Sequence, residues 1–233
     1  MKAVILAAGK GERMRPLTLK TPKPLLKVNG KPILDYILES FPSEIDEVII
    51  VVKYLGNHIK KYIGTKNLWM RIRYVQGSDK GSAYSFMATQ KYLNDERFLV
   101  INGDELTDSV DIVNILKKNL SILVFRPDNP SACGMASLRK DGTIVKIIEK
   151  PARTKSTLAV NGVMVLNTDI FDYTPQLSKG EFYLSTMIGH FARDHKLFPM
   201  KLKKTIIDIS TPDDLIRAGK ILRARRKIGK QQI

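Results

Sequence analysis

The first half of the chain alternates short apolar runs with segments that are typical of helices. The apolar runs predict buried strands over residues 2–7, 47–52, 71–75, 98–102 and 121–125. The segments between them predict helices over residues 32–40, 55–63, 81–92 and 110–118. Strands and helices that alternate in this way predict a parallel, mostly buried sheet with right-handed crossovers.

The second half has a different pattern. Residues 135–138 and 144–149 flank an Asp141-Gly142 turn, which predicts an antiparallel hairpin. Further strands are predicted over 159–166, 197–201 and 205–209, and a helix over 184–194. Thr211 and Pro212 open the last helix as N-cap and first-turn proline.

We therefore expect an α/β fold with a Rossmann-like mixed, mainly parallel sheet flanked by helices. The hairpin region predicts a small β-rich lobe folded onto this sheet. The length of 233 residues is that of one domain, and no linker or repeat divides it.

Composition and charge narrow the classes of function. No stretch approaches the ~18 apolar residues of a membrane span, and no secretory leader is visible, so we expect a cytoplasmic protein without a membrane partner. The lone Cys133 excludes an internal disulfide and a cysteine metal cluster. The net charge of +16 suits either nucleic acid or an anionic small substrate. Because aromatic residues make up only 7% of the chain and do not interleave with a basic patch, we expect no nucleic-acid partner.

The first strand runs directly into a glycine-rich, basic loop. Backbone N–H groups of such loops bind anionic oxygens, and Arg13, Arg15 and Lys23 add positive charge beside them. The loop differs from the dinucleotide fingerprint, because Met14 stands where the third glycine belongs. It also differs from a P-loop, because Lys10 is followed by glycine. The pattern therefore predicts a phosphate site of another kind.

Two segments carry a family resemblance. Leu-Ala-Ala-Gly-Lys-Gly-Glu-Arg-Met-Arg-Pro-Leu-Thr at residues 6–18 and Thr-Pro-Lys-Pro-Leu-Leu at 21–26 resemble the signature of the sugar-1-phosphate nucleotidylyltransferases. The resemblance implies an enzyme that transfers a nucleotidyl group from a nucleoside triphosphate to a sugar 1-phosphate and releases pyrophosphate. It also implies a Mg²⁺ cofactor and the capacity to form a homo-oligomer.

The same resemblance implies how the chain is organised. About residues 1–126 would bind the nucleotide, and about 127–233 would bind the sugar and end in a helix. Some relatives continue into a C-terminal β-helix domain with acyltransferase activity, and we expect the short form without it. The proportions are similar to those of N-acetylmuramate-1-phosphate uridylyltransferases and glucose-1-phosphate thymidylyl- or uridylyltransferases.

The resemblance assigns roles at the phosphates. Arg13 and Lys23 match the catalytic cations that face the triphosphate. Asp104, at the end of the fourth strand, and Asp208, ahead of the last helix, match the two metal aspartates, and Asp104 also counts among the nucleotide contacts. Asp108 is expected to cap a helix instead. The loop residues expected to approach the nucleotide through their backbone are Leu6, Ala7, Ala8, Gly9 and Gly11.

The resemblance also assigns a sugar site. Glu149 and Lys150, in a Glu-Lys-Pro motif, would bind the sugar hydroxyls and the sugar phosphate, and Asn161 with Gly162 would contact the sugar. Thr186 stands where many members carry aspartate, so no role is assigned there.

Gln76 and Gly81 have the spacing of the base-reading pair of thymidylyl- and uridylyltransferases. A glutamine amide matches the acceptor and donor of uracil or thymine, which favours UTP or dTTP. A mannose-1-phosphate guanylyltransferase, a cytidylyltransferase for an alcohol phosphate and a regulatory relative that binds nucleotide sugars without catalysis remain as alternatives.

Overall fold

The computed structural model describes residues 1–64, 66, 68–94, 97–205 and 207–230, except for the side chains of 226–230. Its described part contains a nine-stranded sheet. The sheet strands are β1 (Lys2–Ala7), β4 (Glu47–Val52), β5 (Arg71–Gln76), β6 (Phe98–Asn102), β8 (Ser121–Phe125), β9 (Gly134–Leu138), β10 (Ile144–Glu149), β11 (Leu158–Leu166) and β14 (Phe198–Lys201).

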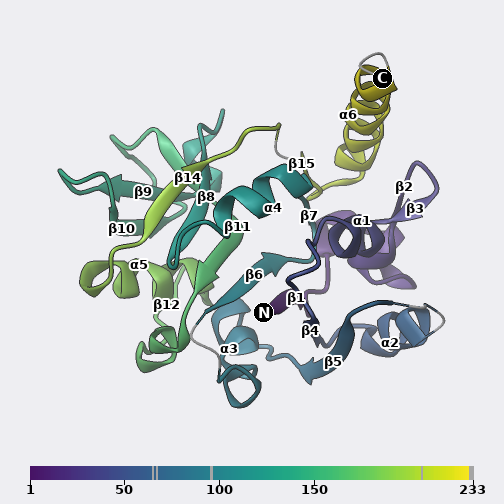
Figure 1. Cartoon of the computed structure of the whole chain (residues 1–233), viewed down its shortest axis with the longest axis horizontal. Helices are drawn as coiled ribbons and strands as arrows, with labels where there is room; N and C mark the ends of the chain where they lie inside the picture. Colours follow the sequence, from purple (N-terminus) through teal and green to yellow (C-terminus); the bar gives the residue numbers. More distant parts are fainter. Residues whose placement is uncertain (65, 67, 95–96, 206, 231–233) are drawn as a thin grey trace.

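Three two-stranded ribbons and six α-helices surround this sheet in the described chain. The ribbons pair β2 (Lys27–Val28) with β3 (Lys31–Pro32), β7 (Glu105–Leu106) with β15 (Ile207–Asp208), and β12 (Leu177–Ser178) with β13 (Glu181–Phe182). The helices are α1 (Ile33–Glu39), α2 (Gly56–Gly64), α3 (Ser82–Met87), α4 (Ser109–Ile115), α5 (Leu184–Asp194) and α6 (Pro212–Lys230). In Figure 1, α6 projects from the body of the molecule. No helix in the described residues is long and apolar enough to cross a membrane.

The sheet is mixed. β6, β1, β4 and β5 are neighbours in this order and run parallel, whereas β11 pairs antiparallel with β6, β8 and β9. The register aligns Ala7 with Val52 and Val52 with Gln76, so the carboxyl ends of β1, β4 and β5 lie along one edge. Ligands of open α/β sheets bind at such an edge. The expected Rossmann-like, mainly parallel sheet is therefore confirmed.

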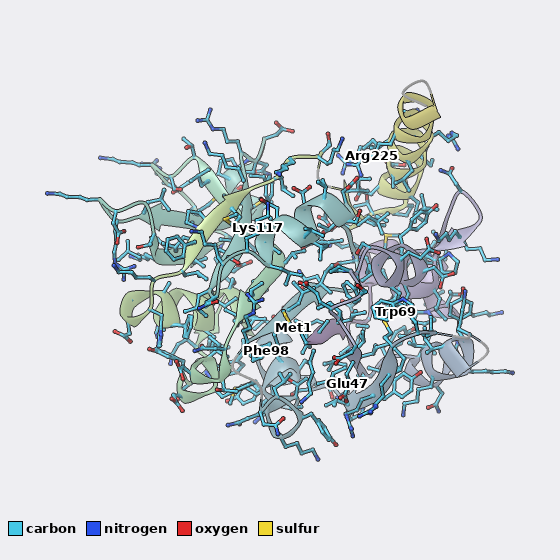
Figure 2. The ribbon with its side chains drawn as sticks, viewed as in Figure 1. Met1, Glu47, Trp69, Phe98, Lys117 and Arg225 are labelled. Atoms are coloured by element: carbon cyan, nitrogen blue, oxygen red, sulfur yellow. The ribbon has the colours of Figure 1, made fainter. Side chains whose placement is uncertain are left out.

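The core lies on both faces of the sheet, because the strands are buried on both sides. Ile5 and Ile50 face α1, α2, α4 and α6, whereas Val4 and Val51 face α3 and α5. This alternation follows from the period of two along each strand. Figure 2 shows Phe98, which is fully buried, near the centre of the molecule.

Several elements depart from the sequence prediction. The helix predicted over 81–92 is divided into α3 and a 3-10 turn at Gln90–Tyr92. The buried Thr89 donates its hydroxyl to the Phe86 carbonyl at 2.7 Å, and a threonine that bonds to nearby backbone competes with the helix. The strand predicted over 205–209 is reduced to β15, and residue 206 lies outside the described residues.

Other local predictions are confirmed. Asp108 caps α4 by accepting the Val110 N–H at 3.1 Å. β9 and β10 form the expected hairpin, with Gly142 at a positive φ of 84° in its turn. The strands of the second half join the same sheet as β1, because β11 inserts between β6 and β8. The division into a nucleotide half and a sugar half stays a prediction.

Candidate functional site

The loop after β1 folds back on itself. Gly11 has φ 62°, in the left-handed region that favours glycine, and a β-carbon there would lie 3.0 Å from the methyl group of Thr18. The Thr18 hydroxyl donates to the Gly11 carbonyl at 2.8 Å. The loop conformation therefore depends on a glycine at position 11, whereas a side chain at Gly9 would meet nothing within 4 Å.

The β7–β15 ribbon brings the two expected metal ligands to one place. Asp208 on β15 is in register with Glu105 on β7, directly after Asp104. The Ile209 N–H also donates to the Asp104 carbonyl at 3.1 Å. Two aspartates that are far apart in the sequence thus lie on adjacent backbone segments.

One expected catalytic cation, Lys23, contacts an aspartate directly, and the other, Arg13, does so through Ser210. Lys23 is only 9% exposed, and its Nζ lies 2.6 Å from Asp104 Oδ2. Arg13 Nη2 donates to Ser210 Oγ at 3.2 Å, and Ser210 donates to the Asp208 carboxylate at 2.9 Å. Arg13, Lys23, Asp104 and Asp208 therefore belong to one connected polar cluster.

Asp104, Asp208 and the adjacent Glu105 bring three acidic side chains close together in the cluster. Burial raises the pKa of Asp208, and the charge of Asp104 raises it further, while the Ser210 hydroxyl and Lys23 oppose the shift. Burial and then the charges of both aspartates raise the pKa of Glu105 to about 8. A hard divalent cation would relieve this repulsion.

The donor set fits Mg²⁺, which is usually bound through one or two carboxylates together with water and substrate phosphates. Asp104 and Asp208 supply the two carboxylates. Among the residues that the structure describes, no group of three or more His, Cys, Asp or Glu side chains is arranged to hold a metal ion. A metal at Asp104 and Asp208 would thus need further ligands from substrate and water.

A cavity of about 270 Å³ lies beside this cluster. The predicted residues that line it are Arg13, Asp104, Glu149, Asn161, Gly162 and Asp208. Asn161 is 4% exposed, and neither its Nδ2 nor its Oδ1 has a hydrogen-bond partner. A buried amide without partners is costly unless a ligand or water satisfies it. The cavity therefore has unused capacity to bind a polar ligand.

Glu149 lines the same cavity, whereas Lys150, which follows it on a strained turn, lies outside the lining. Glu149 Oε2 accepts the Ser185 hydroxyl at 2.5 Å. Lys150 has φ 44°, which is rare for a residue other than glycine, and such strain clusters at functional sites. Its Nζ lies 3.1 Å from the hydroxyl of Tyr183, which lines the cavity.

The two expected base-reading residues lie outside the cavity lining. Gln76 is exposed at the end of β5. Gly81 has φ 126°, and a β-carbon there would lie 2.6 Å from the Phe182 carbonyl oxygen, so packing against β13 already requires glycine. The next loop residue, Gly77, packs equally tightly, since a β-carbon there would lie 2.6 Å from that of Ala8. The loop after β5 and the glycine-rich loop after β1 are thus in contact through Gly77 and Ala8.

Sequence reasoning missed several polar residues that line the cavity, including Asn102 and Ser185. Glu105, Ser210 and Tyr183 also line it. Glu105 directly follows Asp104, and Ser210 lies two residues after Asp208, so proximity to the two expected metal ligands was a usable signal. Nothing in the sequence indicated that Tyr183 would lie against Lys150.

Comparison with known proteins gives a consistent set of relatives. A nucleotidyl transferase family model matches residues 2–225. The bifunctional protein GlmU of Methanocaldococcus jannaschii is 35% identical over 226 residues, which cover 95% of this chain and 54% of that protein. The bifunctional sugar-1-phosphate nucleotidylyltransferase/acetyltransferase of Sulfurisphaera tokodaii is 30% identical over 226 residues, which cover 94% of this chain and 55% of that protein. The chain thus spans about half the length of these curated relatives.

Solved structures share the fold. A putative glucose-1-phosphate thymidylyltransferase from Bacillus anthracis in complex with sucrose superimposes with a TM-score of 0.81 at 25% identity, covering 96% of this chain and 95% of that one. A UDP-glucose pyrophosphorylase complexed with UDP-glucose gives a TM-score of 0.84 at 20% identity, covering 96% and 98%. The second similarity is one of fold alone.

Proposed function

Because this chain belongs to the nucleotidyl transferase family, we propose that it transfers a nucleotidyl group from UTP or dTTP to a sugar 1-phosphate in a Mg²⁺-dependent reaction. A phosphate oxygen of the sugar 1-phosphate forms a bond to the α-phosphorus of the triphosphate. The bond from this phosphorus to the oxygen that bridges to the β-phosphorus breaks, and pyrophosphate leaves. The products are a nucleoside-diphosphate sugar and pyrophosphate.

The observation that carries this proposal is the polar cluster of Arg13, Lys23, Asp104 and Asp208. Lys23 contacts Asp104, Arg13 reaches Asp208 through Ser210, and the β7–β15 ribbon joins these two pairs, so that four separate segments of the chain meet. Phosphoryl chemistry depends on positioning and charge neutralisation more than on a protein nucleophile. Two cations and two carboxylates beside a polar cavity supply that environment.

Each residue of the cluster has a separate part in the proposed reaction. Lys23, a compact charge held at a buried position, would neutralise the α-phosphate during attack. Arg13 can bind two oxygens at once and would hold the leaving pyrophosphate. Asp104 and Asp208 would hold Mg²⁺, which when bound supplies positive charge to the phosphate oxygens.

The sugar phosphate would occupy the cavity. Glu149 would accept hydrogen bonds from sugar hydroxyls, and Lys150 would pair with the sugar phosphate. The amide of Asn161 offers both donors and an acceptor, which suits a ligand that carries hydroxyl groups. The Gly162 backbone lies beside it in the cavity wall.

The preference for a pyrimidine base is supported by position. Gln76 ends β5 at the same sheet edge as the glycine-rich loop after β1, and Gly77 packs against Ala8 of that loop, which supports a base-binding role for Gln76. The glutamine amide would pair with the O4 and N3–H groups of uracil or thymine. The sugar itself is not specified by these contacts.

A matrix of the four triphosphates against glucose, mannose, N-acetylglucosamine and N-acetylmuramate 1-phosphates tests the proposal through pyrophosphate release. We expect Mg²⁺-dependent turnover with UTP or dTTP and at least one sugar. A preference for GTP with mannose 1-phosphate would make the chain a guanylyltransferase. Turnover only with CTP and an alcohol phosphate would make it a cytidylyltransferase, and binding without turnover would make it a regulatory relative.

A further inference from the structure

An irregularity in β11 lies directly beside the candidate sugar site. β11 pairs with β8 at Val160 and again at Met164, with a register shift between them. Its pairing with β6 begins only at Val163. In the described pairings of β11, Asn161 and Gly162 therefore have no partner residue on a neighbouring strand. Bulges of this kind redirect side chains and are frequent next to active sites.

The side chain of Glu105 binds the backbone N–H of Gly162, one of the two residues without a strand partner. The Gly162 N–H donates to Glu105 Oε2 at 2.9 Å and to Oε1 at 3.2 Å. Asn102 Nδ2 donates to the same Oε1 at 2.9 Å. Because a buried N–H must find a partner, the Glu105 carboxyl group accepts the hydrogen bond that a neighbouring strand would otherwise accept at this point.

The packing around this contact leaves no room for a side chain at position 162. A β-carbon on Gly162 would lie 1.9 Å from Asn102 Nδ2 and 2.6 Å from Glu105 Oε1. The glycine is thus required by the close approach of the two side chains. Asn102, Glu105 and Gly162 form a packed unit at the base of the cavity, and all three line it.

The backbone of Glu105 takes part in a second connection. It pairs with Asp208 through the β7–β15 ribbon, while its side chain binds β11. One residue therefore joins the strand of an expected metal ligand to the strand of the unpartnered Asn161.

We infer that Glu105 is a positioning residue for the sugar site: its carboxyl group fixes the Gly162 backbone and thereby aims the neighbouring Asn161 amide into the cavity. This inference rests on the proposed function for its ligand, a sugar 1-phosphate. It assigns Glu105 no contact with the reacting atoms.

Steady-state kinetics of Glu105→Ala are the first test. We expect the KM for the sugar 1-phosphate to rise about tenfold or more, a loss of about 1.4 kcal/mol, while the KM for the triphosphate stays within about twofold. Glu105→Gln keeps an acceptor for the Gly162 N–H and should recover most of the sugar affinity. An equal rise in both KM values, or a fall in kcat alone, would overturn the inference. Should Glu105→Ala fail to fold, Glu105→Asp, whose shorter carboxylate cannot reach Gly162, replaces it.

A buried acid outside the site provides the matched control. Glu47, which is labelled in Figure 2, is 9% exposed and pairs with Arg73. It is the first residue of β4, whereas the carboxyl end of β4 lies at the edge of the sheet beside the glycine-rich loop. Glu47→Ala should lower stability without a selective change in the KM for sugar. If it changes that KM as much as Glu105→Ala does, the effect of Glu105 is only structural.

A double-mutant cycle with Asn161→Ala tests how Glu105 acts. If Glu105 acts through Asn161, the KM of the double variant for the sugar 1-phosphate should be about that of the single variant with the higher KM. Additive losses would mean that Glu105 affects the sugar by another route and would contradict the inference.

Hydrogen exchange of the Gly162 amide gives a readout that needs no substrate. Glu105→Ala should accelerate this exchange, whereas Glu47→Ala should leave it unchanged. If the wild type turns over no substrate pair but Gly162 loses protection in Glu105→Ala, the proposed function fails, whereas the hydrogen bond between Gly162 and Glu105 is supported. If the enzyme is active and Gly162 keeps its protection in Glu105→Ala, the inference about Glu105 fails by itself.

Discussion

The polar cluster of Arg13, Lys23, Asp104 and Asp208, here called the phosphate cluster after its proposed role, adjoins the cavity lined by Glu149, Asn161 and Gly162, here called the sugar cavity after its proposed ligand. The polar groups of the two regions are in opposite states. In the phosphate cluster the side chains satisfy one another, since Lys23 pairs with Asp104 and Arg13 binds Ser210. In the sugar cavity the buried amide of Asn161 has no partner. The first region must exchange internal contacts for contacts with its ligand, whereas the second already presents unfilled hydrogen-bonding groups.

This difference has consequences for catalysis and binding. Once the phosphate cluster has exchanged these contacts for the substrate, its charges stabilise most strongly the charge that grows on the phosphates in the transition state, so the cluster should contribute mainly to kcat. A preformed cavity with an unpartnered amide should contribute mainly to ground-state binding, and thus to KM. Substitutions in the two regions test this division.

The largest effect is expected from the metal aspartates. Asp104→Asn and Asp208→Asn should each lower kcat by about 10³-fold or more, because each weakens the site for the cation that would neutralise the phosphates. The fold should persist, which circular dichroism and thermal unfolding check. Asp213→Asn, an exposed acid in the first turn of α6, should behave as the wild type. Normal Mg²⁺-dependent turnover in either site variant would remove the metal assignment.

The cations come next. Arg13→Ala and Lys23→Ala should lower kcat by about 10²–10³ and raise KM less, because charge on the bridging oxygen and the leaving pyrophosphate grows in the transition state. The exposed Lys20 in the same segment offers a control, and Lys20→Ala should retain wild-type kcat. A rise in KM alone would mean that Arg13 and Lys23 only hold the substrate, and the proposed contrast between the regions would disappear.

Asn161 tests the other side of the comparison. Asn161→Leu removes a buried amide without partners and should raise the KM for the sugar 1-phosphate about tenfold or more. The same change should stabilise the free enzyme by about 1 kcal/mol, which corresponds to about 2–4 °C in Tm for a domain of this size. Asn167 provides the control, because its Oδ1 is also buried without a partner but the residue does not line the cavity, so Asn167→Leu should leave the KM unchanged. A loss of both stability and sugar affinity in Asn161→Leu would show that the amide is needed by the fold.

The two regions also differed in how far the sequence revealed them. The phosphate cluster was predictable because Arg13 and Lys23 belong to a dense local motif and Asp104 follows an evident strand. The fold class followed from the alternation of strands and helices, but the insertion of β11 between β6 and β8 did not, because strand order depends on long-range pairing. Glu149 and Asn161 were selected by resemblance, whereas Glu105 and Tyr183 were missed, because their roles depend on a bulge and a strained turn that appear only after folding.

The smallest effect is expected at Gln76, the proposed base-reading residue, which lies outside both regions. UTP or dTTP should be used at least about tenfold better than GTP by kcat/KM, because a polar group left unpaired by the wrong base costs about 1–3 kcal/mol. Gln76→Ala should reduce this preference to about twofold or threefold while lowering the best rate less, since an exposed amide at the end of β5 is far less constrained than the buried groups. Gln90→Ala, at an exposed glutamine in the turn after α3, is the control and should keep the wild-type preference. If Gln76→Ala lowers all four triphosphates equally, the residue supports the loop and does not read the base. The contact between Gly77 and Ala8 would then be the route by which this loop affects the phosphates.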